Sequence, residues 1–431
     1  MDSRLEQFSH SLSTKRDLNP LLERVGGAAA VLIGTASHGA SEPLRWRAHI
    51  TRRLIEEKGF SFVAIEADWP SCYQINRFVK GMPGAHGTAR AAIAAFNRWP
   101  TWMWANSETL QFIEWLARFN SERPVDTQVG FYGIDLSNLW DSLSSATEYL
   151  ADSIPDRPHD ARHAYECLLP FRDEIDRYPW TTEAVPALCR EALSNVLFTL
   201  EHLPPSELAG DSEEALSARQ NALSAVHAER YYRDTAQESP DSWNVREEHM
   251  AHIFFNLLNF YAGKPSGPKG VIWAHDMHAG DVRATDAVDT DRVSLGQIVR
   301  GSLSPADTCI VGSGFYQGNV LAAADWNRPL QQMTAPPAIR DSWEALLHDD
   351  SMQDRLLLFS QENGSEAARE TRDHREIGVI YDPNAEFGNY VPTIIGERYD
   401  AFLFIDTVSA VHPLPIEAVA GGPPSTYPSA A

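Results

Sequence analysis

The sequence predicts an α/β protein, with a central, largely parallel or mixed sheet flanked by helices and a helical lobe inserted over the cleft. Three observations support this fold class. Short, continuous apolar runs of strand length recur along the chain, as is typical of strands buried on both faces. An amphipathic helical pattern separates the first two runs, which indicates a βαβ unit. Residues 138 to about 260 show helical periodicity without a strong strand.

The first half of the chain contains the first part of the predicted core. Residues 1–27 have an amphipathic helical pattern, and residues 28–33 form the first buried strand. Residues 44–58 form a helix that ends at Gly59, because glycine is the preferred residue just past a helix C-terminus. Residues 60–65 form the second strand, and this βαβ unit predicts a parallel pair. A helix at 110–119 and a strand at 128–134 follow.

The second half returns to the sheet after the helical region. Its predicted strands are 270–274, 308–312, 318–323, 377–381 and 401–405, with a partly helical stretch at 346–373. Prolines punctuate the helical region, which favours an insertion or subdomain. We therefore predict a core in two halves, 1–137 and 267–415, a helical lobe at 138–266 and a flexible Gly/Pro/Ser-rich tail at 416–431.

Composition restricts the possible partners. The chain has 36 Lys+Arg against 59 Asp+Glu and a formal net charge of -23, which argues against nucleic acid and anionic lipid as partners. No window approaches the roughly 20 apolar residues that cross a bilayer, and the polar start has no secretory pattern. Four scattered cysteines without a C-x-x-C pair fit a reducing compartment, so we expect a cytoplasmic protein. We expect no cofactor or metal, and the oligomeric state stays open.

Titratable residues follow several of the predicted strands. His38 follows the first strand, Glu66 the second, Asp135 the third, and His275 with His278 the fourth. Ligands in α/β proteins bind beyond the carboxyl ends of the strands, so we expect these side chains to share one cleft. A histidine can take a proton from water, and a carboxylate can orient the imidazole and stabilise its cation.

Other roles compete for some of these residues. Asp68 precedes Trp69 and Pro70, which suits a helix N-cap. Asp135 could likewise be the N-cap of the helix that follows it. His38 alone could be a turn residue, and Trp102 and Trp104 could belong either to the core or to the lining of a pocket.

Longer motifs show a resemblance to a known family. The motifs are G-T-A-S-H-G-A-S-E (34–42), R-A-H-I-T-R-R-L-I-E-E-K-G-F (47–60), A-I-E-A-D-W-P (64–70), N-R-F-V-K-G (76–81), W-P-T-W-M-W (99–104), G-F-Y-G-I-D (130–135), Q-N-A-L (220–223), E-R-Y-Y-R (229–233), S-W-N-V-R-E-E-H-M (242–250), W-A-H-D-M-H-A-G-D (273–281) and I-G-V-I-Y (377–381). With these, nearly the whole chain resembles the erythromycin esterase family, also known as succinoglycan-biosynthesis-like proteins.

The resemblance implies a hydrolase that opens a macrolide lactone with an activated water, without a covalent intermediate and without a required metal. His38 would be the general base and Glu66 its assistant. Arg47, His275 and His278 would position the ester and stabilise charge. The implied substrate is a small ester or lactone of macrolide or polyketide type. Its binding residues would be Thr35, Asp135, Trp102, Trp104 and Asp276.

Three positions depart from the family pattern. Thr35 stands where the motif G-E-x-x-H-G has a glutamate, and a hydroxyl cannot accept a proton at neutral pH. Asp276 replaces the usual Asn, and if it turns inward it could partly restore the missing negative charge. Ala105 stands where an arginine is common. These departures keep two alternatives open. One is a natural-product tailoring enzyme, such as a cyclase or lyase, or a small-molecule binder. The other is a metal-dependent hydrolase built on His38, Glu66, His275 and His278.

Overall fold

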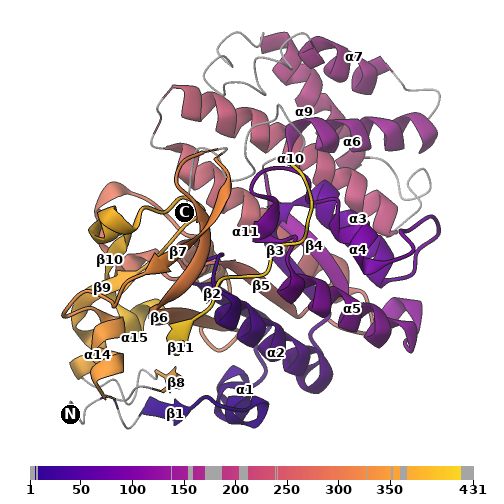
Figure 1. Cartoon of the computed structure of the whole chain (residues 1–431). Helices are drawn as coiled ribbons and strands as arrows, with labels where there is room; N and C mark the ends of the chain where they lie inside the picture. The colour runs from indigo at the N-terminus through magenta and orange to yellow at the C-terminus, as the bar shows by residue number, and fades with distance from the viewer. Residues whose placement is uncertain are drawn as a thin grey trace.

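A computed structural model describes residues 5, 8–136, 138–153, 159–169, 187–202, 212–237, 239, 241–326, 328–350, 353–359 and 366–418. In Figure 1, a central sheet carries helices on its faces, and the helices α6, α7, α9 and α10 gather above one end of it. The predicted fold class, a largely parallel α/β sheet flanked by helices, is confirmed.

Within the described residues the main sheet has the strand order β1-β8-β11-β6-β2-β5-β3-β4, and β7 pairs with β6. The neighbours from β11 to β4 are parallel, whereas β1, β7 and β8 pair antiparallel. The strands are β1 (Ser9–Ser11), β2 (Ala30–Thr35), β3 (Phe62–Asp68), β4 (Gly130–Asp135), β5 (Gly270–His275), β6 (Thr308–Ala323), β7 (Leu330–Ala335), β8 (Arg355–Leu358) and β11 (Ala401–Val408). A separate antiparallel pair consists of β9 (Thr371–Arg375) and β10 (Tyr390–Ile394).

Helices cover both faces of the sheet. The helices are α1 (Asn19–Val25), α2 (Ser41–Lys58), α3 (Trp69–Val79), α4 (Ala89–Ile93), α5 (Ser107–Ser121), α6 (Leu139–Ser153), α7 (His159–Leu168), α9 (Ala187–His202), α10 (Glu213–Ala236), α11 (Asp241–Ala262), α12 (Asp276–Ala279), α13 (Leu295–Ser302), α14 (Trp343–Asp350) and α15 (Ile395–Arg398). One hydrophobic cluster joins α2 and α5 to the sheet. A second joins α11, α13 and α14 to the opposite face, because alternate residues of each strand point to opposite sides.

The first βαβ unit differs from its prediction in one respect. Strands β2 and β3 are parallel, but β5 lies between them and hydrogen-bonds to both. The expected direct pairing of the first two strands is therefore wrong. The helix between them ends as predicted, with Gly59 in the left-handed conformation at φ 71.

Other segments also depart from the sequence predictions. The predicted strands at 308–312 and 318–323 are one long strand, β6, in which Gly318 has a positive φ of 139. Residues 377–381 make only isolated bridges at Ile377 and Ile380, and β9 precedes them instead. The predicted helix at 1–27 is α1 preceded by a 3-10 turn and the short edge strand β1. The tail from residue 419 lies outside the described residues.

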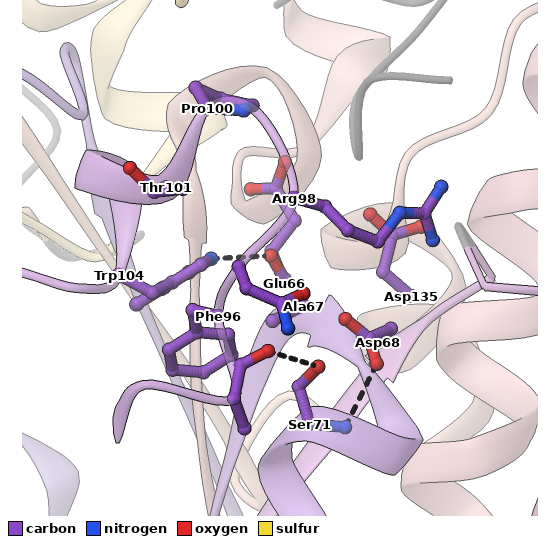
Figure 2. Close-up of a pocket in the computed structure, with 12 residues that line it drawn as sticks. Glu66, Ala67, Asp68, Ser71, Phe96, Arg98, Pro100, Thr101, Trp104 and Asp135 are labelled. Atoms are coloured by element: carbon purple, nitrogen blue, oxygen red, sulfur yellow. Dashed lines mark hydrogen bonds between the residues drawn. The ribbon is translucent and has the colours of Figure 1, made fainter. Parts of the chain in front are cut away.

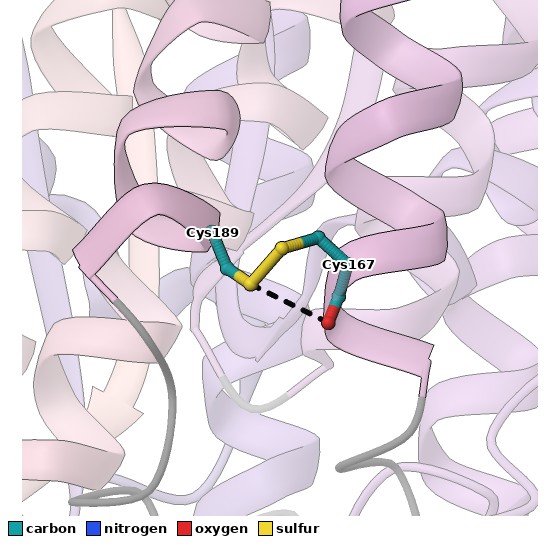
Figure 3. Close-up of a disulfide and its surroundings, with 2 residues drawn as sticks. All are labelled: Cys167 and Cys189. Atoms are coloured by element: carbon teal, nitrogen blue, oxygen red, sulfur yellow. Dashed lines mark hydrogen bonds between the residues drawn. A yellow bond between two sulfur atoms is a disulfide. The ribbon is translucent and has the colours of Figure 1, made fainter.

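Between β4 and β5 the described segments are helical. Helices α6, α7, α9 and α10 share a hydrophobic cluster of their own, which supports the predicted lobe, although its boundaries stay a prediction. Cys167 of α7 and Cys189 of α9 form a disulfide (Figure 3), a pairing that the scattered cysteines did not predict. The prolines expected to punctuate this region lie outside the described residues. No helix in the described part of the chain combines the length and the apolar character needed to cross a bilayer.

Candidate active site

Four neighbouring strands bring the predicted side chains together. In the order β2-β5-β3-β4 their carboxyl ends meet at one edge of the sheet. His38 follows β2, His275 ends β5, Glu66 lies near the end of β3 and Asp135 ends β4. All four residues are at most 2 % exposed, so the edge holds a buried cluster of titratable groups.

His38 is a buried imidazole that lies close to a carboxylate. Its Nε2 has no hydrogen-bond partner among the described residues and lies 3.8 Å from Oε2 of Glu66. The ring of His275 is 5.1 Å away between centroids. Burial lowers the pKa of His38 to about 3, and Glu66 opposes that shift. The ring is therefore neutral at pH 7, and one nitrogen can accept a proton.

Glu66 is the centre of the cluster. Its Oε2 accepts a 2.8 Å hydrogen bond from the backbone N–H of His275, and its Oε1 accepts a 3.1 Å bond from Arg246 Nη2. Nε2 of His278 lies 3.4 Å from the same Oε1. Burial raises the pKa of Glu66, but His278, His38 and Arg246 together hold it well below its usual value. Glu66 is thus a fixed anion.

Arg246 of α11 joins Glu66 to Asp135. Its Nε and Nη2 donate to the two oxygens of Asp135 at 3.0 and 2.8 Å, which is the bidentate geometry that favours strong pairing. Asp135 does not cap α6, because Asn138 accepts the N–H of Asp141 instead. By contrast, Asp68 caps α3 as predicted, and its Oδ1 accepts from Ser71 N at 2.9 Å.

His278 has an acid on each side. Its Nδ1 makes a short hydrogen bond to Oε1 of Glu247, also on α11, and its ring stacks on Trp243 at 5.1 Å and 9°. Burial lowers the pKa of His278, but Glu247 and Glu66 outweigh that effect and raise it to about 9.

His275 has a defined tautomer. Its Nδ1 accepts from the backbone N–H of Met277 at 3.3 Å, so Nε2 must carry the hydrogen. That Nε2–H faces the carbonyl oxygen of Ile377 at 3.3 Å. The imidazole is therefore oriented by backbone on both nitrogens.

Arg47 and Thr35 lie deeper under the same edge. The Arg47 guanidinium carbon lies 5.0 Å from the Trp104 ring and 4.6 Å from the Trp273 ring, and its Nε and Nη1 have no partner within the described chain. Burial lowers the pKa of Arg47 to about 9, against the effect of Glu66. Thr35 pairs with His275 across the sheet and is fully buried, and its Oγ1 is unpaired among the described residues.

A small pocket opens beside this cluster (Figure 2). Glu66, Asp68 and Asp135 lie on one side of it and the loop residues Pro100 and Thr101 on the other. Trp104 lines it and donates from Nε1 to the Glu66 carbonyl at 2.8 Å. The cavity is about 20 Å³, which is room for water but not for a bulky ester. Trp102 is fully buried in the hydrophobic cluster and does not line this pocket.

Asp276 faces away from His38. Its Oδ2 accepts from Ser313 N at 3.2 Å and lies 3.7 Å from Nε2 of His374, whose Nδ1 bonds Glu344 at 2.6 Å. Asp276 therefore belongs to a second buried cluster, which it forms with His374 and Glu344. Burial raises the pKa of Asp276, which disfavours its charged form. The position does not support the idea that Asp276 replaces the carboxylate missing at Thr35.

Metal binding gains no support from the geometry. Across the described ranges, no group of three or more His, Cys, Asp or Glu side chains is arranged to hold a metal ion.

Sequence reasoning missed three residues of the site. Trp243, Arg246 and Glu247 all come from the start of α11 and cover the strand ends. They stand in the motif S-W-N-V-R-E-E-H-M, which carried no assigned role. A signal was present, since α11 carries an adjacent arginine and glutamate directly after Val245 in a helix rich in apolar residues, and buried charges need partners.

The fold and this edge define an α/β protein with buried histidines and carboxylates beyond the carboxyl ends of its parallel strands. The chain belongs to the erythromycin esterase family, whose model matches residues 55–408. This membership indicates an ester-hydrolase-like function.

Solved structures share the fold along nearly the whole chain. A succinoglycan biosynthesis protein matches with a TM-score of 0.77 at 20% identity, and the match covers 95% of this chain and 97% of that protein's chain. A Bacillus cereus protein has a TM-score of 0.77 at 18% identity, covering 96% and 98%. A mutant of the erythromycin esterase EreC in its open conformation has a TM-score of 0.67 at 16% identity, covering 95% and 99%.

Proposed function

We propose that this protein opens an ester or lactone by attack of a water that His38 activates, without a covalent intermediate. The observation that carries the proposal is the unpaired Nε2 of His38, buried 3.8 Å from Glu66. A neutral imidazole beside a fixed anion is suited to take a proton from water, because the anion stabilises the imidazolium that forms. Family membership supports an ester-hydrolase-like reaction.

The reaction has two steps. In the first, water transfers one proton to Nε2 of His38 as its oxygen bonds the carbonyl carbon, and the carbonyl oxygen becomes an oxyanion. Arg47, His275 and His278 are the groups proposed to position the ester and stabilise that charge. In the second, the bond to the leaving alkoxide breaks, and the His38 imidazolium returns the proton to it. The products are a carboxylic acid and an alcohol, or one opened ring.

The substrate that we propose is a small lactone or ester of macrolide or polyketide type. Asp135 and Trp104 are proposed to contact it, since both line the pocket beside Glu66. A cavity of about 20 Å³ does not admit such a molecule, so binding requires this face to open. Opening would separate α11 or the loop around Pro100 from the strand ends.

The buried Thr35 favours one alternative. Without a carboxylate there, a cyclase or lyase, or a small-molecule binder, could use the same cleft. The variant Thr35→Glu distinguishes these functions. A gain of hydrolysis would show that the scaffold is hydrolytic, whereas no gain together with tight binding of an apolar polyketide would favour the alternative.

The direct experiment incubates the protein with a panel of macrolide lactones and simple esters and follows the mass gain of one water. We expect His38→Ala to abolish ring opening and His86→Ala, at an exposed position, to leave it unchanged. Ring opening that persists in His38→Ala would overturn the role of His38. No turnover of any ester by the native chain would overturn the proposed reaction.

A further inference from the structure

His278 differs from the other two histidines of the edge in what faces its nitrogens. Among the described residues Nε2 has no hydrogen-bond partner in either His38 or His278, and His275 contacts backbone groups. His278 lies between two carboxylates, Glu247 on its Nδ1 and Glu66 near its Nε2. We infer that Glu247 is a positioning residue that holds His278 as an imidazolium at neutral pH, so that His278 stabilises charge and does not act as a base. The consequence for catalysis rests on the proposed function.

The first step concerns Nδ1. A carboxylate oxygen only accepts hydrogen bonds, so the short contact with Glu247 requires a hydrogen on Nδ1. The other oxygen of Glu247, Oε2, accepts from Leu295 N at 2.7 Å, at the first turn of α13, which fixes the carboxyl group opposite His278. An anion is favoured at the N-terminus of a helix.

The second step concerns Nε2. With Nδ1 protonated, a neutral ring would turn the Nε2 lone pair toward Oε1 of Glu66 at 3.4 Å, and two electron-rich atoms would face each other. A proton on Nε2 turns this contact into an attraction. The stacked Trp243 ring at 5.1 Å also favours a cation over its face. The contacts with Glu247 and Trp243 of α11 and with Glu66 of β3 thus all favour the doubly protonated ring.

The third step is the charge balance of the edge. The acids joined to one another through Arg246 and His278 are Glu66, Asp135 and Glu247, and the arginines near Glu66 are Arg246 and Arg47. Within this group a neutral His278 leaves three acids against two arginines, and a charged His278 balances them; Asp68 and Arg98, which line the adjacent pocket, add one acid and one base. A developing oxyanion is disfavoured in a negatively charged site and favoured beside a fixed cation.

The variant Glu247→Gln tests this assignment, with Glu248→Gln, an exposed neighbour on α11, as the matched control. The first readout is the NMR titration of the His278 ring in histidine-labelled protein, assigned by the loss of its signal in His278→Asn. We expect a native midpoint near pH 9, a shift downward by more than about one unit in Glu247→Gln, and no shift in Glu248→Gln. Glu247→Asp, which restores the charge, should raise the midpoint again.

The second readout is kinetic. We expect kcat in Glu247→Gln to fall roughly 10- to 100-fold with KM unchanged, and the lost rate to return at acidic pH, where His278 regains its proton. A native His278 that is neutral at pH 7, or a midpoint equal in native and Glu247→Gln protein, would overturn the inference. Normal titrations without any ester turnover would overturn the proposed hydrolysis and leave the protonation of His278 intact.

Discussion

Replacing Arg246 with methionine gives the sharpest prediction for stability. Arg246 is 2 % exposed and is the cation shared by Glu66 and Asp135, which are equally buried. Methionine keeps much of the apolar volume but leaves two carboxylates without this partner. Glu66 retains contacts with His278 and His275 N, whereas Asp135 loses its bidentate pairing. We therefore expect a large loss of stability, dominated by Asp135.

The contacts give the magnitude. At separations of 2.8–3.1 Å and an effective dielectric constant near 20, each charge pair contributes about 5 kcal/mol of Coulomb energy. Desolvation of the charges offsets much of this when the pair forms. Removal of one partner leaves the remaining acids buried and lowers the free energy of unfolding by roughly 3–5 kcal/mol. In the double variant Arg246→Met with Asp135→Asn, the neutral amide should recover a substantial part of the loss.

Equilibrium unfolding in urea at pH 7, followed by tryptophan fluorescence, measures this effect. The control is Arg45→Met on α2, where Arg45 pairs with Glu42 at 2.6 Å on an exposed surface. That change should lower the unfolding free energy by less than about 1 kcal/mol. A loss in Arg246→Met as small as in the control, or no recovery in the double variant, would refute the buried-pair reasoning.

Three further predictions concern packing, crosslinking and pH. Gly39→Ala should lower the unfolding free energy by roughly 1–3 kcal/mol in urea, because its Cβ would lie 2.0 Å from the Leu321 backbone oxygen, and an unchanged midpoint would contradict this. Denatured protein should show two reactive thiols before reduction and four after it, and four thiols without reductant would exclude the disulfide. Replacing both Cys167 and Cys189 with serine should lower the free energy of unfolding by roughly 3 kcal/mol. Burial lowers the pKa of His374, but its acidic neighbours outweigh this and raise it to about 9. The protonated His374 therefore contributes its full stabilisation below its unfolded pKa, near 6.5. As the pH rises toward 9, the free energy of unfolding should fall by up to roughly 3 kcal/mol. A His374→Gln variant should show a smaller dependence of this free energy on pH.

Local patterns predicted most strands of the parallel core but not how they pair. The segments of β2, β3, β4 and β5 are continuous apolar runs of strand length, and such runs indicate a buried strand from the local sequence alone. The strands β1 and β7 were missed because short, partly exposed strands carry little apolar signal. The buried strand β8 was missed because its apolar run lies in the stretch 346–373, which was predicted as partly helical. Tertiary pairing, not local propensity, defines them.

The candidate site follows the same division. His38, Glu66 and His275 stand directly at or after buried strands, so a parallel sheet necessarily brings them to one edge. Asp276 illustrates what the pattern could not decide. A residue one position past a strand end can face either side of the sheet, and the helical turn at α12 directs this one toward His374.

The sequence by itself determined which segments form the parallel core, that their polar ends share one edge, and that the chain resembles an esterase family. Only the tertiary structure decided that β5 enters between β2 and β3, and that Trp243, Arg246 and Glu247 close over that edge. Strand identity depends on neighbouring residues, whereas these arrangements join segments that are far apart in the chain. The start of α11 closes over the edge because the buried charges of Arg246 and Glu247 find their partners there, in Asp135, Glu66 and His278.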